Sequence, residues 1–272
     1  MTKQASADWG TLQGRNALAE RARGAARGRG ANPPRLIRNA AAFAAAFNVS
    51  PTTIARLELY ERLLRQWQKA VNLVAPSTLG QIWHRHFADS AQLAPLLPAV
   101  QTWVDLGSGG GFPGLVVAIL LAEREELGER GGRQPNVPRV TLVERNQRKC
   151  AFLSEVVRQT GILPRVAVDI LSTSGELAAT QAILRGSQVI SARALAPLDR
   201  LLGLTAPLFS PGAVGVFLKG RDVAAELEVA QGRWNFTVEL VASRTEPDGC
   251  IVMIRQLEPK PKATSAGRTA KE

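Results

Sequence analysis

A glycine-rich segment at residues 105–114 (DLGSGGGFPG) carries the clearest signal for ligand binding in the sequence. A strand is expected to end and a helix to begin at its two ends, so that its glycines permit a tight turn and bring a ligand close to helical N–H groups. The positions of Gly107 and Gly109 suit both a dinucleotide and S-adenosylmethionine. Asp105 favours S-adenosylmethionine, because an acid two residues before the first glycine commonly holds its cationic methionyl group.

A second acid, Glu144, ends the strand predicted at residues 140–143, where its carboxylate can accept hydrogen bonds from both hydroxyls of a ribose. It follows the glycines by more than the roughly 20 residues typical of such motifs, and a loop predicted at residues 124–138 accounts for the difference. The alternative is a surface carboxylate that pairs with Arg145 or Arg148.

Alternating strands and helices after Pro98 must position these acids and glycines. They predict an α/β, Rossmann-like fold with a seven-stranded, mostly parallel sheet covered on both faces. A tight turn at residues 247–249 joins the last two strands, so one of them must run antiparallel at the end of the sheet. Strands are expected at residues 102–106, 140–143, 166–170, 189–192, 213–218, 237–242 and 250–254, helices at residues 115–123, 147–159, 198–208 and 223–231, and a second loop at residues 172–187.

The chain divides into four predicted segments. Residues 1–38 and 258–272 are basic and poor in large apolar side chains, and they are predicted to be disordered tails. Residues 39–98 carry apolar side chains at helical spacing and predict an N-terminal helical subdomain, with Ser50 and Pro51 at the start of one helix and a second helix that starts near residues 77–78. Residues 99–257 form the predicted cofactor-binding domain.

The formal charge of +11 and the isoelectric point near 10.7 indicate a polyanionic partner such as nucleic acid or an anionic membrane. Residues 1–40 carry eight basic residues against two acids and residues 258–272 carry four against two, so most of the excess lies in the ends. With only two cysteines, a disulfide framework and a multi-cysteine zinc site are excluded. Because no apolar run reaches about 18–20 residues and no secretory leader is evident, the protein is expected to be cytoplasmic and not to bind a membrane.

Both histidines, His84 and His86, lie in the predicted helical subdomain. Two positions apart on a helix, they face different directions and cannot form an i, i+4 metal pair, so no metal is expected. His86 and Asp89 are predicted to form a hydrogen-bonded pair that closes the subdomain over the cofactor. The alternative is a purely structural role for this pair.

Several separated segments are recognisable together: residues 67–74 (WQKAVNLV), 84–90 (HRHFADS), 105–114, 143–153 (VERNQRKCAFL), 190–198 (ISARALAPL) and 218–220 (LKG). They resemble the small-subunit ribosomal RNA methyltransferase family RsmG, also called glucose-inhibited division protein B. The resemblance covers about residues 48–257 and implies a class I methyltransferase fold with S-adenosylmethionine as the cofactor. It implies methylation of N7 of a guanosine in the decoding-site loop of 16S rRNA, within the small ribosomal subunit or its assembly intermediate.

The resemblance also implies which residues contact the cofactor. Gly107 and Phe112 are expected to line it, and Arg193 is expected to lie beside it at the end of the fourth strand. The family contacts adenine with a pair of residues after the third strand. That pair aligns with Thr173 and Ser174 or, after a shift of two positions, with residues 175–176.

Guanine N7 carries a free lone pair, so its methylation requires no general base and depends on proximity and in-line orientation. A hydrogen-bond donor on guanine O6 and cations at the flanking phosphates assist such a transfer. Arg193 and Lys219, at the ends of neighbouring predicted strands, are the candidate catalytic residues. The alternatives are a contact with the cofactor carboxylate for Arg193 and a plain surface charge for Lys219.

Two other functions stay open at this point. One is a ribosome-binding protein that retains the cofactor fold without turnover. The other is a nicotinamide-dependent dehydrogenase, which is disfavoured because the sequence has no Tyr-x-x-x-Lys pair and its single tyrosine, Tyr60, precedes the predicted sheet. No coiled-coil heptad indicates a partner chain, so a monomer is expected.

Overall fold

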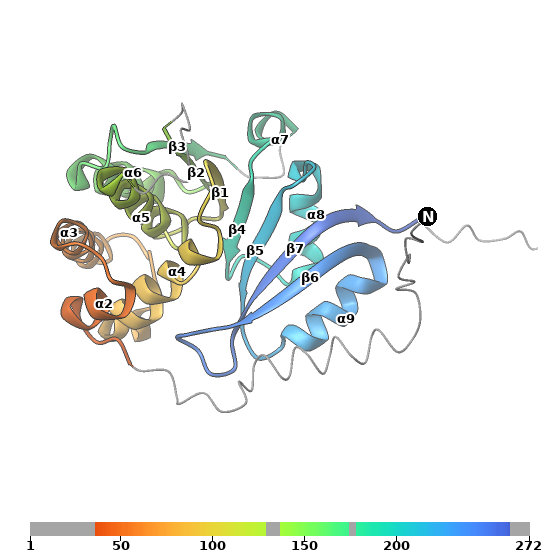
Figure 1. Ribbon diagram of the computed structural model, residues 1–272, viewed down its shortest axis with the longest axis horizontal. Helices are drawn as coiled ribbons and strands as arrows, with labels where there is room; N and C mark the ends of the chain where they lie inside the picture. Colours follow the sequence, from red (N-terminus) through yellow and green to blue (C-terminus); the bar gives the residue numbers. More distant parts are fainter. Residues whose placement is uncertain (1–35, 129–136, 174–177, 262–272) are drawn as a thin grey trace, which may run out of the picture.

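The computed structural model describes residues 36–128, 137–173 and 178–261, and this part of the chain contains a seven-stranded sheet with the order β3-β2-β1-β4-β5-β7-β6 (Figure 1). Strands β1 to β5 are parallel, whereas β7 lies between β5 and β6 and runs antiparallel to both. The predicted α/β fold with one reversed strand is confirmed. The strands are β1 (Thr102–Leu106), β2 (Arg139–Glu144), β3 (Ala167–Ser172), β4 (Val189–Arg193), β5 (Val214–Lys219), β6 (Trp234–Ala242) and β7 (Cys250–Pro259).

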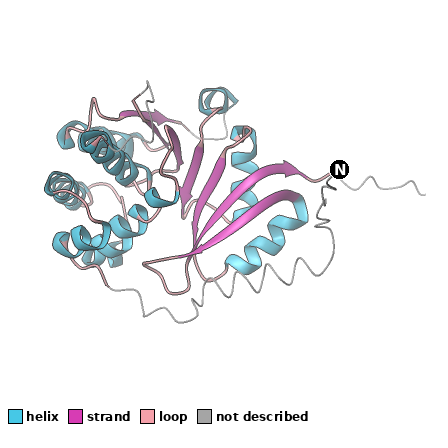
Figure 2. Cartoon of the chain, in the orientation of Figure 1, coloured by secondary structure: helices cyan, strands magenta, loops and turns pink. Residues whose placement is uncertain are grey.

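Helices cover both faces of the sheet, as Figure 2 shows, and each face has its own apolar core. Within β1 the side chains alternate between the two cores, with Trp103 in the first and Val104 in the second. The first core contains residues of α5 (Gly114–Leu127) and α6 (Gln147–Thr160), and the second contains residues of α7 (Ala178–Leu184), α8 (Leu198–Thr205) and α9 (Val223–Arg233). This arrangement leaves the carboxyl ends of β1, β2 and β4 to position the predicted site residues.

The N-terminal helices α2 (Ala40–Phe47) and α3 (Pro51–Trp67) pack on the first face of the sheet domain. Helix α3 begins as predicted, because Ser50 accepts a hydrogen bond from the backbone N–H of Thr53 and a proline occupies the first helical position. Its apolar side chains form one continuous core with those of α5 and α6. The domain boundaries at residues 38, 98 and 257 stay predictions, and Ile37 is buried in this core.

The helix expected from residue 77 onward is broken into a 3₁₀ helix (Pro76–Gln81), a π-helix (Trp83–Ala88) and the short α4 (Asp89–Ala91), with a further 3₁₀ turn at Ala94–Leu96. A π-helix has a wider turn than an α-helix and is frequent at functional sites. Five of its six residues here are buried. An apolar pattern assessed only at α-helical spacing does not reveal such a segment.

Helix α7 occupies part of residues 172–187, so the prediction of a loop there was wrong for Ala178–Leu184. The sequence of this helix, AATQAIL, consists largely of good helix formers. The polar and glycine-containing residues on either side of it suggested a continuous loop. The predicted loop at residues 124–138 is partly replaced by the last turn of α5, and its residues 129–136 lie outside the described residues.

Candidate active site

The glycine-rich segment turns sharply at the carboxyl ends of β1 and β2. Gly107, Gly109 and Gly111 have φ angles of 68°, 56° and 92°, in the left-handed region that glycine adopts without strain. The backbone N–H groups of Gly107 and Ser108 donate to the carbonyl oxygen of Val143 at 2.9 and 3.1 Å. The protein itself therefore fixes the backbone of this turn against the end of β2.

Asp105 lies beneath the glycine turn and is fully buried. Its Oδ2 accepts a hydrogen bond from the backbone N–H of Gly114 (3.1 Å), and its Oδ1 accepts one from Ser191 Oγ (2.7 Å). Burial raises the pKa of the carboxyl to about 6, against the lowering effect of these hydrogen bonds. Asp105 thus joins β1, β4 and the start of α5; its predicted contact with the cofactor stays a prediction.

Glu144 ends β2 next to the same turn and is also buried. Its Oε2 accepts a hydrogen bond from the N–H of Gly109 (3.0 Å), and its Oε1 accepts one from the N–H of Asn146 (2.8 Å). In this geometry the carboxylate binds backbone groups rather than the neighbouring Arg145 or Arg148. Glu144 therefore lies at the glycine turn, where the ribose contact was predicted.

Thr173 directly follows β3, whose Ser172 pairs with Glu144 of β2, so it stands at the same edge of the sheet as this acid. It is half-buried, and its Oγ1 accepts a hydrogen bond from Thr180 Oγ1 at 3.4 Å. Ser174 and the alternative pair at residues 175–176 lie outside the described residues. The adenine contact therefore stays a prediction.

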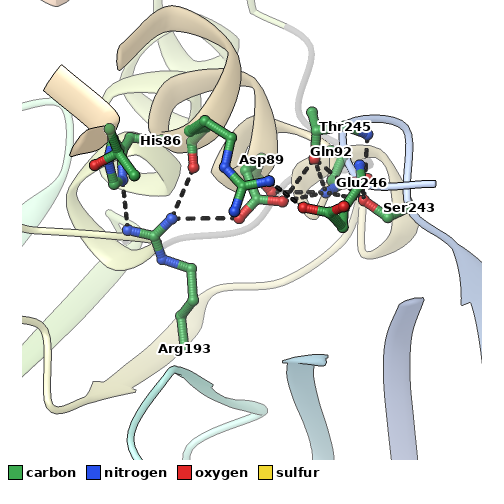
Figure 3. A network of polar contacts seen from close by, with 9 residues as sticks. His86, Asp89, Gln92, Arg193, Ser243, Thr245 and Glu246 are labelled. Atoms are coloured by element: carbon green, nitrogen blue, oxygen red, sulfur yellow. Dashed lines mark hydrogen bonds and ion pairs between the residues drawn. The ribbon is translucent and has the colours of Figure 1, made fainter. Parts of the chain in front are cut away.

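Arg193, at the end of β4, is the centre of a polar network that joins the sheet to the π-helix (Figure 3). Its Nη1 donates to the carbonyl oxygen of Arg85 (2.9 Å) and to Asp89 Oδ2 (3.3 Å), and its Nη2 donates to His86 Nδ1 (2.8 Å). Its guanidinium carbon lies 5.1 Å from the ring centroid of Phe112, a cation–π distance. The predicted direct hydrogen bond between His86 and Asp89 is wrong, because each of these side chains binds the guanidinium of Arg193 instead. The same guanidinium lies against Phe112, so two predicted cofactor residues are brought together.

The loop between β6 and β7 supports the same network from the other side, as Figure 3 shows. Asp89 Oδ1 accepts hydrogen bonds from Thr245 Oγ1 (2.7 Å) and from Gln92 Nε2 (3.0 Å). Arg85 forms an ion pair with Glu246 of that loop. Both oxygens of Asp89 are therefore bound, so its carboxylate holds Arg193 in a fixed direction.

His86 is neutral in this network and carries its proton on Nε2. Arg193 can only donate, so His86 Nδ1 must accept and Nε2 donates to Thr78 Oγ1 at 2.8 Å. Burial, followed by the charges of Arg193 and Arg85, lowers the pKa of His86 to about 3. Protonation of Nδ1 would turn an N–H group toward the guanidinium, so the network requires the neutral ring.

We expect acid to destabilise the wild-type protein more than a His86→Gln variant. The unfolded state takes up a proton on this histidine below pH 6.5, whereas the folded state does so only near pH 3, so the folded state loses stability as pH falls through this window. Between pH 8 and pH 5 the wild-type protein is expected to lose about 2 kcal/mol more of its free energy of unfolding than the variant. Urea unfolding of both proteins at the two pH values measures this difference, and an equal pH dependence would contradict the neutral assignment. The raised pKa of Asp105 has the opposite effect, because it makes the folded state more stable as pH falls, but this contribution is the same in both proteins.

Lys219, at the end of β5, is engaged inside the protein, and its side chain is only 8 % exposed. Its Nζ donates to the carbonyl oxygen of Ala196 (2.7 Å) and forms an ion pair with Glu226 Oε2 (2.6 Å). These contacts fix the loop that follows Arg193 and make Lys219 a positioning residue in this structure. Its predicted contact with an RNA phosphate stays a prediction.

Tyr60 of α3 is a site neighbour that the sequence analysis did not identify, because its spacing marks it only as a core residue. It is fully buried, and its hydroxyl donates to the carbonyl oxygen of Gly110 in the glycine turn. Its ring stacks on Phe112 at a centroid distance of 5.4 Å and an interplanar angle of 9°. Helix α3 thus contacts the glycine turn directly, and nothing in the local sequence around Tyr60 indicates this contact.

Within residues 36–128, 137–173 and 178–261, no group of three or more His, Cys, Asp or Glu side chains is arranged to hold a metal ion. Within the same ranges, every helix is too short or too polar to cross a membrane.

A solved methyltransferase from Geobacter sulfurreducens superposes with a TM-score of 0.48 at 13 % identity, over 74 % of this chain and 88 % of that chain. Residues 53–246 match the family model GidB, described as rRNA small subunit methyltransferase G. A protein of Parvibaculum lavamentivorans with the name Ribosomal RNA small subunit methyltransferase G is 45 % identical over 79 % of this chain and 88 % of its own length. Its namesake in Rhodospirillum centenum is 46 % identical over 80 % of this chain and 91 % of its own. The family model and these two relatives agree, and the chain belongs to the rRNA small subunit methyltransferase G family.

Proposed function

We propose that this protein transfers the methyl group of S-adenosylmethionine to N7 of a guanosine in the decoding-site loop of 16S rRNA. The observation that carries the proposal is the match of residues 53–246 to the methyltransferase family model. The glycine turn, Glu144 and Arg193 support it, because they end neighbouring strands at one edge of the sheet. A ligand held at this edge reaches both the turn and the polar network.

The residues at this edge suit S-adenosylmethionine. The space beside Gly109 is open, since an added Cβ would meet only the carbonyl oxygen of Gly107, at 3.7 Å. The carboxylate of Glu144 uses one lone pair of each oxygen for a backbone N–H and keeps others for two ribose hydroxyls. When bound, S-adenosylmethionine supplies an electrophilic methyl group on a sulfonium.

Arg193 is the candidate catalytic residue in this proposal. Guanine N7 attacks with its own lone pair, so the protein has no proton to remove and must only hold the base in line with the methyl group. Of the five guanidinium N–H groups, three bind Arg85, His86 and Asp89, which leaves two for guanine O6 or for the cofactor carboxylate. A donor oriented in this way before the base arrives stabilises the transition state without reorganisation.

The substrate is ribosomal RNA, and we infer that it is presented within the small ribosomal subunit or its assembly intermediate. We infer that the protein acts as a monomer in the cytoplasm. The 217 residues between the two basic ends carry a net charge of only +3. Local placement of Arg and Lys side chains near the site must therefore direct the RNA, and the basic ends add a salt-sensitive attraction.

Incubation of the purified protein with methyl-labelled S-adenosylmethionine and small ribosomal subunits from a strain that lacks the modification tests the proposal. We expect label in 16S rRNA and 7-methylguanosine among its nucleosides by mass spectrometry. Absence of label at both low and high magnesium would overturn the proposed activity. Binding of cofactor and subunit without transfer would instead indicate a ribosome-binding protein that has lost turnover.

Deletion of residues 1–35 is expected to weaken RNA binding about 5- to 10-fold at low salt and to leave cofactor affinity unchanged. The deletion removes seven basic residues but keeps Ile37, whose N–H donates to His84 Nδ1 (3.3 Å) and whose side chain belongs to the core. Loss of these charges reduces counterion release and therefore the salt dependence of binding. RNA titrations from about 50 to 200 mM salt measure the effect. An unchanged salt slope would show that the basic end makes no contact with RNA.

A further inference from the structure

The short connection between β4 and α8 carries an apolar side chain at the glycine turn. Leu195 is 40 % exposed, although its side chain lies directly on Gly107. A Cβ added to Gly107 would be 2.7 Å from Leu195 Cδ1 and 3.5 Å from its Cγ. One face of this side chain is therefore covered by the glycine turn, and the other is open to solvent.

The backbone before Leu195 is strained. Ala194 has a φ angle of 53°, in the left-handed region, which costs free energy for a residue with a Cβ atom. Such strain persists only where the surrounding structure imposes it, and it is concentrated at functional sites. The strain turns the chain directly after Arg193 and directs the next side chain onto Gly107.

Two partly buried contacts hold the other end of this connection, on the side of α8, and impose this conformation. Lys219 Nζ donates to the carbonyl oxygen of Ala196 (2.7 Å), and the N–H of Leu198 donates to Glu226 Oε2 (2.6 Å). Because Lys219 and Glu226 also form an ion pair, they act as one clamp. Arg193 is fixed by the polar network before Leu195, and the Lys219–Glu226 pair fixes the backbone after it. The position of Leu195 is therefore held from both ends.

We propose that Leu195 is a substrate-positioning residue whose open face packs against the plane of the target guanine. This inference rests on the proposed function. Enzymes that modify a base take it out of its stack and hold its faces with aromatic or apolar side chains. One face of Leu195 packs against the glycine turn. RNA that approaches the protein can therefore contact only its other, exposed face. Arg193, two residues earlier, then binds the edge of the base while Leu195 supports its face.

The test compares Leu195→Ala, Leu195→Met and Val229→Ala, a control on α9 that truncates an apolar side chain of 60 % exposure. With small ribosomal subunits as substrate, we expect Leu195→Ala to lower kcat/KM about 10-fold, the effect expected when the open apolar face of a leucine no longer covers the base. Leu195→Met keeps the apolar volume and is expected to stay within about 3-fold of the wild type. Val229→Ala is expected to match the wild type.

Calorimetric titration with S-adenosylmethionine separates a role toward the base from a role toward the cofactor. We expect the cofactor Kd of Leu195→Ala to stay within about 2-fold of the wild type and its Tm within about 2 °C, as for other surface changes. A loss of cofactor affinity that accounts for the loss of kcat/KM would overturn the assignment to guanine, as would wild-type kcat/KM in Leu195→Ala. An inactive wild-type protein would overturn the proposed function, and this inference with it.

Discussion

Replacement of Arg193 by lysine is expected to lower kcat for methyl transfer about 100- to 1,000-fold while the protein stays folded. The guanidinium binds three groups of the π-helix segment at 2.8 to 3.3 Å and lies over Phe112, and each of these contacts uses its planar shape. A lysine ammonium keeps the charge but cannot span the same acceptors while it donates to a ligand. Loss of one oriented donor at a reacting centre typically costs a rate factor of this size.

Arg233→Lys provides the matched control, because Arg233 also pairs with a carboxylate, Asp199, but is 69 % exposed. Exposed ion pairs contribute little, so this variant is expected to retain wild-type kcat and Tm. Methyl incorporation into small ribosomal subunits under saturating cofactor and subunit measures kcat for all three proteins. If Arg193→Lys retained more than about one third of the wild-type kcat, the guanidinium geometry would not matter for the transfer.

The part of the fold that could be predicted from the sequence depends on local signals. Strand β1 is a short, mostly apolar run that is followed by a glycine, β4 is one that ends in an arginine, and the turn at residues 105–114 contains its own glycines. The tight turn before Cys250 also revealed the reversed strand. Each of these features lies within a few residues of the element that it defines, so periodicity and turn residues suffice to find it.

The directions of the side chains at the site could not be predicted in this way. Arg193 and its partner His86 are 107 positions apart, and the π-helix that presents His86 has no simple sequence pattern. Asp105 and Lys219 lie at the predicted strand ends, yet both are turned inward to protein partners that only the packed structure supplies. Strand ends therefore identify candidate residues, whereas tertiary packing decides whether a side chain faces a ligand or supports one that does.

Gly114→Ala is expected to destabilise the protein by about 3 kcal/mol, because α5 approaches the sheet too closely at this point to admit a Cβ. An added Cβ would lie 2.5 Å from Leu142 Cδ2 and 2.6 Å from Asp105 Cβ, so the helix must move away from β1 and β2. That movement breaks the hydrogen bond from Gly114 N–H to Asp105 Oδ2. The Tm is expected to fall by about 6–12 °C for a protein of this size.

The same movement displaces the glycine turn, so cofactor affinity should fall together with stability. Gly232→Ala separates this effect from the general effect of replacing a helical glycine, because Gly232 lies inside α9 with nothing within 4 Å of an added Cβ. This control is expected to be neutral or up to about 1 kcal/mol more stable, since alanine favours a helix over glycine. Thermal unfolding and cofactor titration of both variants measure the two effects. Equal Tm values for Gly114→Ala and the wild type would show that α5 can withdraw from the sheet at no cost, and the close packing would then not hold the turn in place.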